Sequence, residues 1–363
     1  MLPRHAAGAL KLLLVLAVPI VCSSCSKEPA KIAQSMNSPT GGTTPALDST
    51  STGKSVQITD KDHHIFLRPK VGTTQRYRVI DRREDSQEIT DQLFNGTQGK
   101  KKSTNITEFY IRQSVRAVKP DSSVDMSYRI DSVQFSLVQD TTKINYASTR
   151  PQDRKDARFA EYNMFVGQEF GAIVSKLGEI TEVYGLAPML EQAMKDVPDS
   201  MKTEKYKAGA KNAIEMLLKQ YVGLPLMHYP DKPLAKDSTW SIHAETNFPV
   251  LQFVQFPVAI DSKEVVAGFE DHGGVVLAVL EATSRQTPIQ STLEQGGTKA
   301  TLDKFNSTAT SKSQVDDSTG LVVRRVLKSN QSFVFTLETK QQAGKIARNS
   351  QSSTEETTID LLE

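Results

Sequence analysis

The chain has 363 residues, with 44 lysine and arginine side chains against 42 aspartate and glutamate side chains. This balance gives the protein no bulk electrostatic reason to bind nucleic acid, which is excluded as an expected partner. Because only 38% of the residues are hydrophobic and 7% aromatic, part of the chain is expected to be linker and part to be sheet with one solvated face.

Residues 1–24 are predicted to be a signal peptide. Arg4 and Lys11 precede an apolar run over residues 12–21, which is too short to span ~30 Å of hydrocarbon. The following Cys22-Ser23-Ser24-Cys25 resembles a lipobox, although Cys22 replaces the preferred leucine. We therefore expect cleavage before Cys25 and lipid attachment there. The alternative is an ordinary secretory peptide that leaves Cys25 as a free thiol.

Residues 25–60 are predicted to be the lipidated cysteine and a disordered linker, because small, polar and turn-forming residues dominate them. Within the linker, residues 48–50 resemble a bacterial O-glycosylation site, and a plain solvated linker is the alternative. Ser26 after the lipid cysteine favours delivery to the outer membrane, with either the periplasmic or the surface face open. The lipid makes the membrane an expected partner of the chain.

The body, residues 61–363, begins with a strand predicted over 76–80. Apolar residues then alternate with polar ones over 109–117 and 124–130, which predicts a strand pair with one buried face. The alternation changes phase between Ile130 and Val133, which indicates a bulge or a strong bend. Strands that bend in this way are typical of curved sheets.

Two helices are predicted in the middle of the body, after short strands around Gly178. Pro188 suits the first turn of one helix, and Pro198 ends it. Thr203 is the expected N-cap of the second, which runs to Tyr221. The body can therefore be divided into two similar sheet halves joined by the helical segment 186–223.

Short strands are predicted again over 238–246, 254–260, 275–280, 298–305, 321–327, 333–337 and 357–361. Polar turns separate them, which favours antiparallel pairing. The predicted fold class is thus mainly β (α+β), with curved antiparallel sheets and two helices inserted in the middle of the chain.

Four segments together are similar to an uncharacterised family of bacterial envelope lipoproteins. The segments are Tyr77-Arg78-Val79, residues 177–185, residues 229–240 and residues 317–322. At residues 236–238 the chain departs from the Gly-Asp turn of that pattern. The resemblance implies a cell-envelope location and a β-rich fold for the body, but no chemistry.

No residue set reaches a catalytic or cofactor motif, so no catalytic residue, metal or cofactor is predicted. His63 and His64 are interpreted as surface histidines, because adjacent residues of a strand point to opposite faces. Trp240 is interpreted as a core anchor, and residues 248–258 as a buried strand pair. The alternative is a pocket for an apolar ligand, lined by Trp240, Phe248, Phe253 and Phe256 and the two helices.

Three functions remain open. The first is a non-catalytic envelope lipoprotein that binds or scaffolds a protein or lipid partner at the outer membrane. The second is a carrier of lipid or another apolar ligand under the curved sheet. The third is an unrecognised hydrolase.

Overall fold

The computed structural model describes residues 63–91, 98–195, 197–251, 254–295, 297–340 and 345–362. The predicted signal peptide, Cys25, the linker and Phe253 lie outside these residues.

The described residues form a single sheet of thirteen strands. Its main path runs in the order β6-β5-β3-β2-β1-β13-β12-β11-β9-β8-β7, with β4 beside β3 and β10 beside β11. All pairs between these strands are antiparallel. The strand bounds are β1 Thr74–Asp91, β2 Gln98–Val118, β3 Val124–Gln139, β4 Thr142–Ala147, β5 Glu169–Val174, β6 Ile180–Tyr184, β7 Thr239–Leu251, β8 Val254–His272, β9 Val275–Pro288, β10 Thr292–Gln295, β11 Thr298–Asp316, β12 Val322–Thr339 and β13 Ile346–Leu361.

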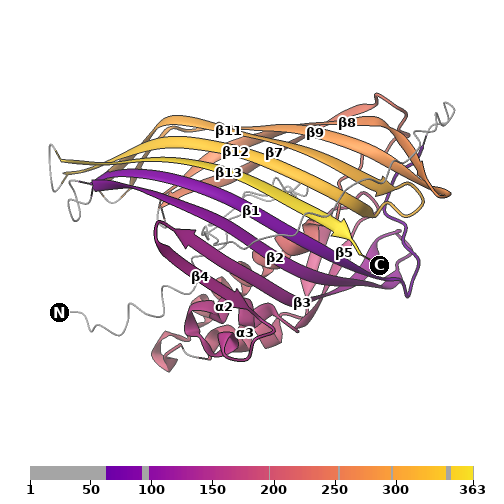
Figure 1. Cartoon of the computed structure of the whole chain (residues 1–363), viewed down its shortest axis with the longest axis horizontal. Helices are drawn as coiled ribbons and strands as arrows, with labels where there is room; N and C mark the ends of the chain where they lie inside the picture. The colour runs from indigo at the N-terminus through magenta and orange to yellow at the C-terminus, as the bar shows by residue number, and fades with distance from the viewer. Residues whose placement is uncertain are drawn as a thin grey trace.

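The first and last strands meet in the middle of the sheet. Tyr77 of β1 pairs with Leu361 of β13, and the ladder continues to Asp91 and Ala347. The strands before the helical segment and those after it are therefore joined along this seam into one sheet. Figure 1 shows the sheet as a long arch with the helices below it.

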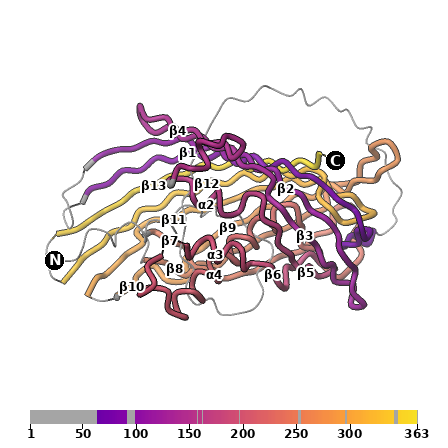
Figure 2. The backbone as a smooth tube through the Cα atoms, turned by 90° about the horizontal axis from the view of Figure 1, so that it is seen from below, coloured from indigo at the N-terminus to yellow at the C-terminus, as the bar shows by residue number. Residues whose placement is uncertain are grey.

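The helices lie in the middle of the chain, as predicted. They are α2 (Ala160–Phe165), α3 (Ala187–Met194) and α4 (Glu204–Gly223), with short 3-10 turns η2 (Asp153–Lys155), η3 (Ala157–Phe159) and η4 (Asp199–Met201). Thr203 caps α4 as expected, because its hydroxyl accepts a hydrogen bond from Tyr206 N at 3.2 Å. Seen from below, α3 and α4 lie across the concave side of the sheet (Figure 2). The α2 helix was not predicted.

The predicted mainly β fold with curved antiparallel strands and inserted helices is confirmed, but the prediction of short strands is wrong. The β2 strand has 21 residues, and β12 is one strand of 18 residues where two were predicted. The basic residues 100–102 lie within β2. In the middle of these strands the alternation continues with polar residues. These polar residues were interpreted as turns between shorter strands.

The predicted phase change in β3 is a β-bulge. Tyr110 pairs with Ser132, whereas the next residue, Ile111, pairs with Ile130, so Asp131 has no partner in the ladder. The carboxylate of Asp131 binds Arg112 at 3.0 Å and Arg129 at 3.3 Å. The bulge thus places an acidic group among arginines. It also shifts the alternation by one residue, so that Val133 lies on the buried face.

The apolar core is divided along the strands. One cluster lies under α2–α4, where Phe109 of β2 meets Tyr221 of α4 with ring centroids 5.2 Å apart. A second cluster surrounds Tyr229 and Trp240. A third joins Phe248 of β7 to Phe333 of β12, with centroids 5.1 Å apart. Because β7 and β12 are four strands apart in the sheet order, this contact requires the sheet to curl strongly.

Candidate functional site

A band of polar side chains crosses the concave face between these apolar clusters. The ladder registers align its residues in three rows. The first row is Gln286-Ser307-Gln331-Ser353-Asp85, the second is Ser262-Ser284-Ala309-Ser329-Glu355-Arg83-Asn105, and the third is Glu264-Ala282-Ser311-Leu327-Thr357-Asp81-Thr107. We call these rows the polar belt. At ~3.4 Å per residue they cover roughly 14 Å along the strands.

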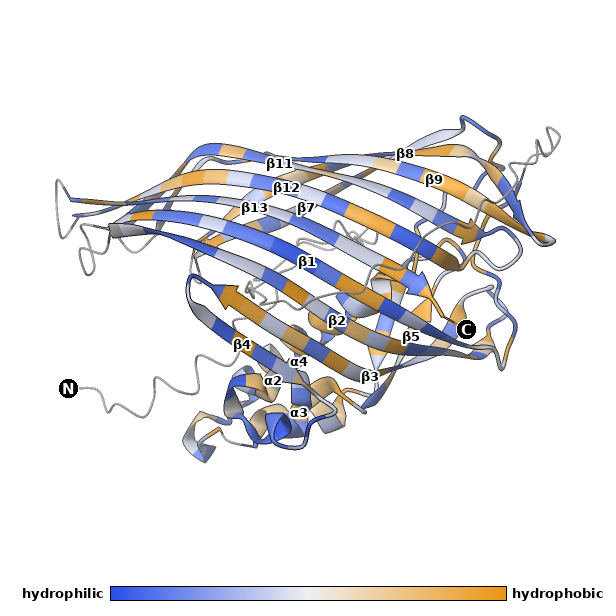
Figure 3. Ribbon diagram, viewed as in Figure 1, coloured by the Kyte–Doolittle hydropathy of each residue, from blue (hydrophilic) through white to orange (hydrophobic). Residues whose placement is uncertain are grey.

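The belt lies on the buried face of each strand. In β1, Tyr77, Val79, Asp81 and Arg83 are all buried, so the same face passes from apolar to polar within a few residues. In β12, the polar residues of this face come first along the strand, and the buried Phe333 follows them. In the hydropathy view, the long strands change colour along their length, with polar stretches between apolar ones (Figure 3).

Several buried atoms of this face have no hydrogen-bond partner within the described chain. They include Glu264 Oε2, Gln286 Oε1, Gln331 Nε2 and, two rows beyond the belt, Asn349 Oδ1. Leaving a buried polar atom unpaired costs about 1–3 kcal/mol, so native proteins rarely do it without a reason. These atoms therefore mark positions where an external polar group would be stabilised.

A group of carboxylates occupies the part of the belt at the β1–β13 seam. Arg83 binds Asp85 at 2.9 Å, and Asp81 accepts a hydrogen bond from Thr357 at 3.0 Å. Burial, reinforced by the nearby Asp81 carboxylate, raises the pKa of Glu355 well above its ordinary value. Burial also raises the pKa of Asp81. The seam therefore favours at least one protonated carboxyl group.

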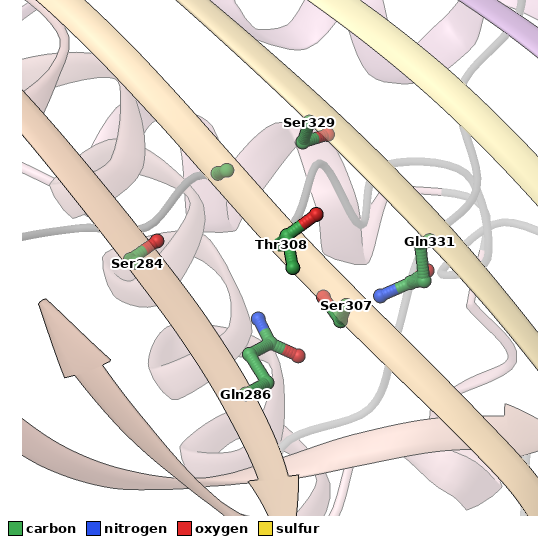
Figure 4. A pocket seen from close by; sticks show the side chains of 7 residues that line it. Ser284, Gln286, Ser307, Thr308, Ser329 and Gln331 are labelled. Atoms are coloured by element: carbon green, nitrogen blue, oxygen red, sulfur yellow. The ribbon is translucent and has the colours of Figure 1, made fainter.

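A small depression lies at the other side of the belt, on β9, β11 and β12. It is a small hollow, part of it open to solvent, and none of its lining residues is charged. Ser307 pairs directly with both Gln286 and Gln331, and the two amides turn toward it (Figure 4). The neighbouring row, Ser284-Ala309-Ser329, has only small side chains, which leaves the space open.

The residues predicted to line an apolar pocket lie in different parts of the fold. Phe248 and Phe256 belong to the same apolar cluster. Trp240 lies in another cluster and is 8% exposed, with its indole Nε1 unpaired within the described chain. Whether these residues contact a ligand stays a prediction.

The polar belt was not found in the sequence. Its signal was present as small or polar residues at every second position, for example Ser, Ala, Ser and Ser at positions 307, 309, 311 and 313. Such a pattern differs from a loop because strict alternation continues on both sides of it.

The interpretation of His63 as a surface residue is wrong. Its Nδ1 lies 3.0 Å from Asp317 Oδ2, and its ring stacks on Phe269 at 4.0 Å. His63 also forms an isolated β-bridge with Leu234, which draws the start of the body into the fold. His243 lies 2.7 Å from Asp261 at an exposed position. Across the described ranges, no group of three or more histidine, cysteine, aspartate or glutamate residues could hold a metal ion.

The sequence pattern of the Family of unknown function (DUF6263) matches residues 121–322, more than half of the chain. The chain belongs to this family. The DUF6263 match runs from the β2–β3 turn to the start of β12, so the helices and the part of the belt on β8, β9 and β11 lie within it. The resemblance to an uncharacterised family is thereby confirmed. No curated protein sequence matches the chain significantly.

Solved structures show only weak similarity to this DUF6263 protein. A lipovitellin structure, titled for its lipid–protein interactions, is 12% identical with a TM-score of 0.42, and the alignment covers 81% of this chain. The chain spans a quarter of that lipovitellin chain, with 25% covered. Pseudomonas aeruginosa OpdQ is 5% identical with a TM-score of 0.21, and 79% of this chain and 99% of OpdQ are covered. These scores do not establish a shared fold. No helix in the described segments is long and apolar enough to cross a membrane.

Proposed function

We propose that this DUF6263 protein is a lipid-anchored, non-catalytic binding protein of the bacterial cell envelope, delivered to the outer membrane. Its ligand lies on the concave face of the sheet, across the polar belt. The lipobox-like Cys22-Ser23-Ser24-Cys25 and the linker after it support the anchor.

The observation that carries the binding role is the set of unpaired buried atoms on the concave face. Glu264, Gln286 and Gln331 come from β8, β9 and β12, so three separate strands each present an unused polar atom to the same side of the sheet. A ligand that pairs these atoms would regain the free energy lost by their burial.

The belt also narrows the kind of ligand. Apolar clusters lie on both sides of it, around Val79 and Phe109 at one end and around Phe256 and Phe333 at the other. A purely apolar ligand would leave the belt unpaired, at further cost. A molecule with both polar and apolar parts can pair the belt and contact an apolar cluster. We therefore favour an amphipathic ligand over a purely apolar one.

The anchor is tested by replacing one cysteine at a time. Cys25→Ser should abolish incorporation of radiolabelled palmitate, because the acylated thiol is lost, and the chain should leave the membrane fraction. Cys22→Ser is the matched control and should keep both label and membrane association. Label retained in Cys25→Ser would show that the chain is not a lipoprotein anchored at this residue.

The binding role is tested by native mass spectrometry of the whole mature chain carrying Cys25→Ala, exported behind an ordinary secretory signal peptide. We expect a reproducible non-covalent adduct. Ser329→Trp should remove it, because the indole would fill the belt. Asn330→Trp, at the neighbouring exposed position, should keep it. If the chain without either tryptophan substitution shows only its own mass and no adduct, this would argue against a tightly held ligand on this face.

A further inference from the structure

The depression between Gln286 and Gln331 has the features of a subsite for one part of a ligand. Gln286 is 9% exposed and Gln331 is 8% exposed, yet Gln286 Oε1 and Gln331 Nε2 have no partner within the described chain. Both residues pair across the ladder with Ser307, which lies between them and is also buried. Three hydrogen-bonding side chains thus converge on one point of the concave face (Figure 4).

The floor beside these side chains is hollow because of the residues in the next row. Ala309 pairs with Ser284 on one side and with Ser329 on the other, so three consecutive strands carry small side chains there. Larger residues at these positions would fill the space. The hollow is small and partly open to solvent. It can therefore contact only one part of a ligand, such as a headgroup, while the rest of the ligand lies elsewhere on the concave face.

The chemistry of the lining indicates which headgroup fits. Amide and hydroxyl side chains supply both donors and acceptors, and rotating an amide by 180° only exchanges its oxygen and its NH₂ group. None of the residues that line the depression is charged. An ionic headgroup placed here would lose its hydration without gaining a counter-charge, which is costly. A neutral group with several hydroxyls or an amide, such as a sugar ring, matches the lining.

We infer that Gln286, Ser307 and Gln331 form a subsite for the neutral, hydroxyl- or amide-bearing headgroup of an amphipathic ligand. This inference rests on the proposed binding function and specifies its polar end. The apolar part of the ligand would extend toward the cluster that contains Phe333, which lies two residues along β12 from Gln331 and on the same face.

The test uses three surfactants with the same octyl chain, namely octyl glucoside, octyl sulfate and octyltrimethylammonium. Each is titrated into the whole mature chain carrying Cys25→Ala, below its critical micelle concentration, and binding is followed by isothermal titration calorimetry. We expect octyl glucoside to bind about tenfold more tightly than either charged surfactant, the effect of about one paired polar group.

Leucine substitutions separate the subsite from the rest of the face. Gln286→Leu and Gln331→Leu should each weaken octyl glucoside binding about tenfold while leaving the charged surfactants unchanged. The thermal midpoint of the free chain should stay the same or rise, because each substitution removes an unpaired buried atom. Gln134→Leu, an exposed glutamine on β3, is the matched control and should change neither quantity.

The outcomes distinguish this inference from the proposed function. If all three surfactants bind equally and the leucine variants have no effect, the amphipathic ligand stands and the subsite is refuted. Tighter binding of a charged surfactant would also refute it. If no surfactant binds at all, the proposed function fails together with the inference. A fall in the thermal midpoint of both leucine variants would show that the amides are structural.

Discussion

Replacing Gly178 with alanine is expected to destabilise the protein by about 3–5 kcal/mol, from backbone strain and overpacking together. Gly178 has φ +88°, a conformation that disfavours side chains, and an added Cβ would lie 1.8 Å from the carbonyl oxygen of Met227. That contact is with backbone, so rotation of a side chain cannot relieve it. The segment pressed against Gly178 is held by Tyr229, whose N–H donates to Leu177 O at 2.8 Å and whose hydroxyl donates to Gly320 O at 2.9 Å.

Gly273→Ala provides the control for this prediction. Gly273 also has a positive φ, +67°, but no atom lies within 4 Å of its added Cβ. The Gly273→Ala variant should therefore lose only the free energy of backbone strain, about 1–2 kcal/mol of stability. Both variants are measured by chemical unfolding followed by circular dichroism. Equal losses in the two variants would show that the close approach of Met227 is not important for stability.

Replacing Glu355 with glutamine is expected to stabilise the protein at neutral pH by about 1–3 kcal/mol, the cost of a poorly satisfied buried polar group. Glu355 lies at the seam among Asp81, Arg83 and Asp85, where three carboxylates share one arginine. Glutamine keeps the size of the side chain and cannot ionise. It therefore removes the cost of a negative charge, or of the proton taken up to avoid that charge.

The sign of the pH dependence follows from the raised pKa of Glu355. Below the ordinary carboxyl pKa of ~4.3 the group is protonated in both the folded and unfolded states, and it contributes no penalty. As the pH rises from there, the unfolded chain releases the proton while the folded chain retains it, so stability falls. The fall ends when the pH passes the pKa of the folded state. In Glu355→Gln this part of the slope should disappear.

The comparison is made by chemical unfolding at a series of pH values between about 3.5 and 8, the range in which a raised carboxyl pKa acts. Glu356→Gln is the matched control, because Glu356 is the next residue and pairs with Lys328 at 2.8 Å in a partly exposed position. It should change stability by less than about 0.5 kcal/mol. A Glu355→Gln variant that is less stable at pH 7, with an unchanged slope, would identify Glu355 as an ionised partner of Arg83.

The sequence predicted those parts of the fold in which local chemistry and packing agree. Thr203 at the start of α4 and the phase change at Ile130 are examples, since a hydroxyl cap and a bulge each leave a direct trace in the residue pattern. The predicted strands ended early where the inner face turns polar, as at Ser329 and Gln331 of β12. Polar residues of this kind are typical of turns, although their spacing at every second position is that of a strand.

The candidate site was beyond prediction for a different reason. Gln286, Ser307 and Gln331 are distributed over three strands, and only the ladder registers place them side by side. The same applies to Glu355 and Arg83, which are directly opposite one another at the seam between the first and last strands. No local pattern encodes such pairings. The predicted aromatic residues, in contrast, were selected by hydrophobicity alone, which does not distinguish a packed core from a ligand surface.

The pairing of β1 with β13 has a consequence for how the protein is made. The chain emerges from the ribosome with its N-terminal end first, so β1 is released long before β13. One edge of β1 must then remain open while almost the whole body follows, and open strand edges promote aggregation. Contacts between residues so distant in sequence also slow folding. A chaperone that shields unpaired strands during synthesis would therefore benefit this protein more than one built from sequential hairpins alone.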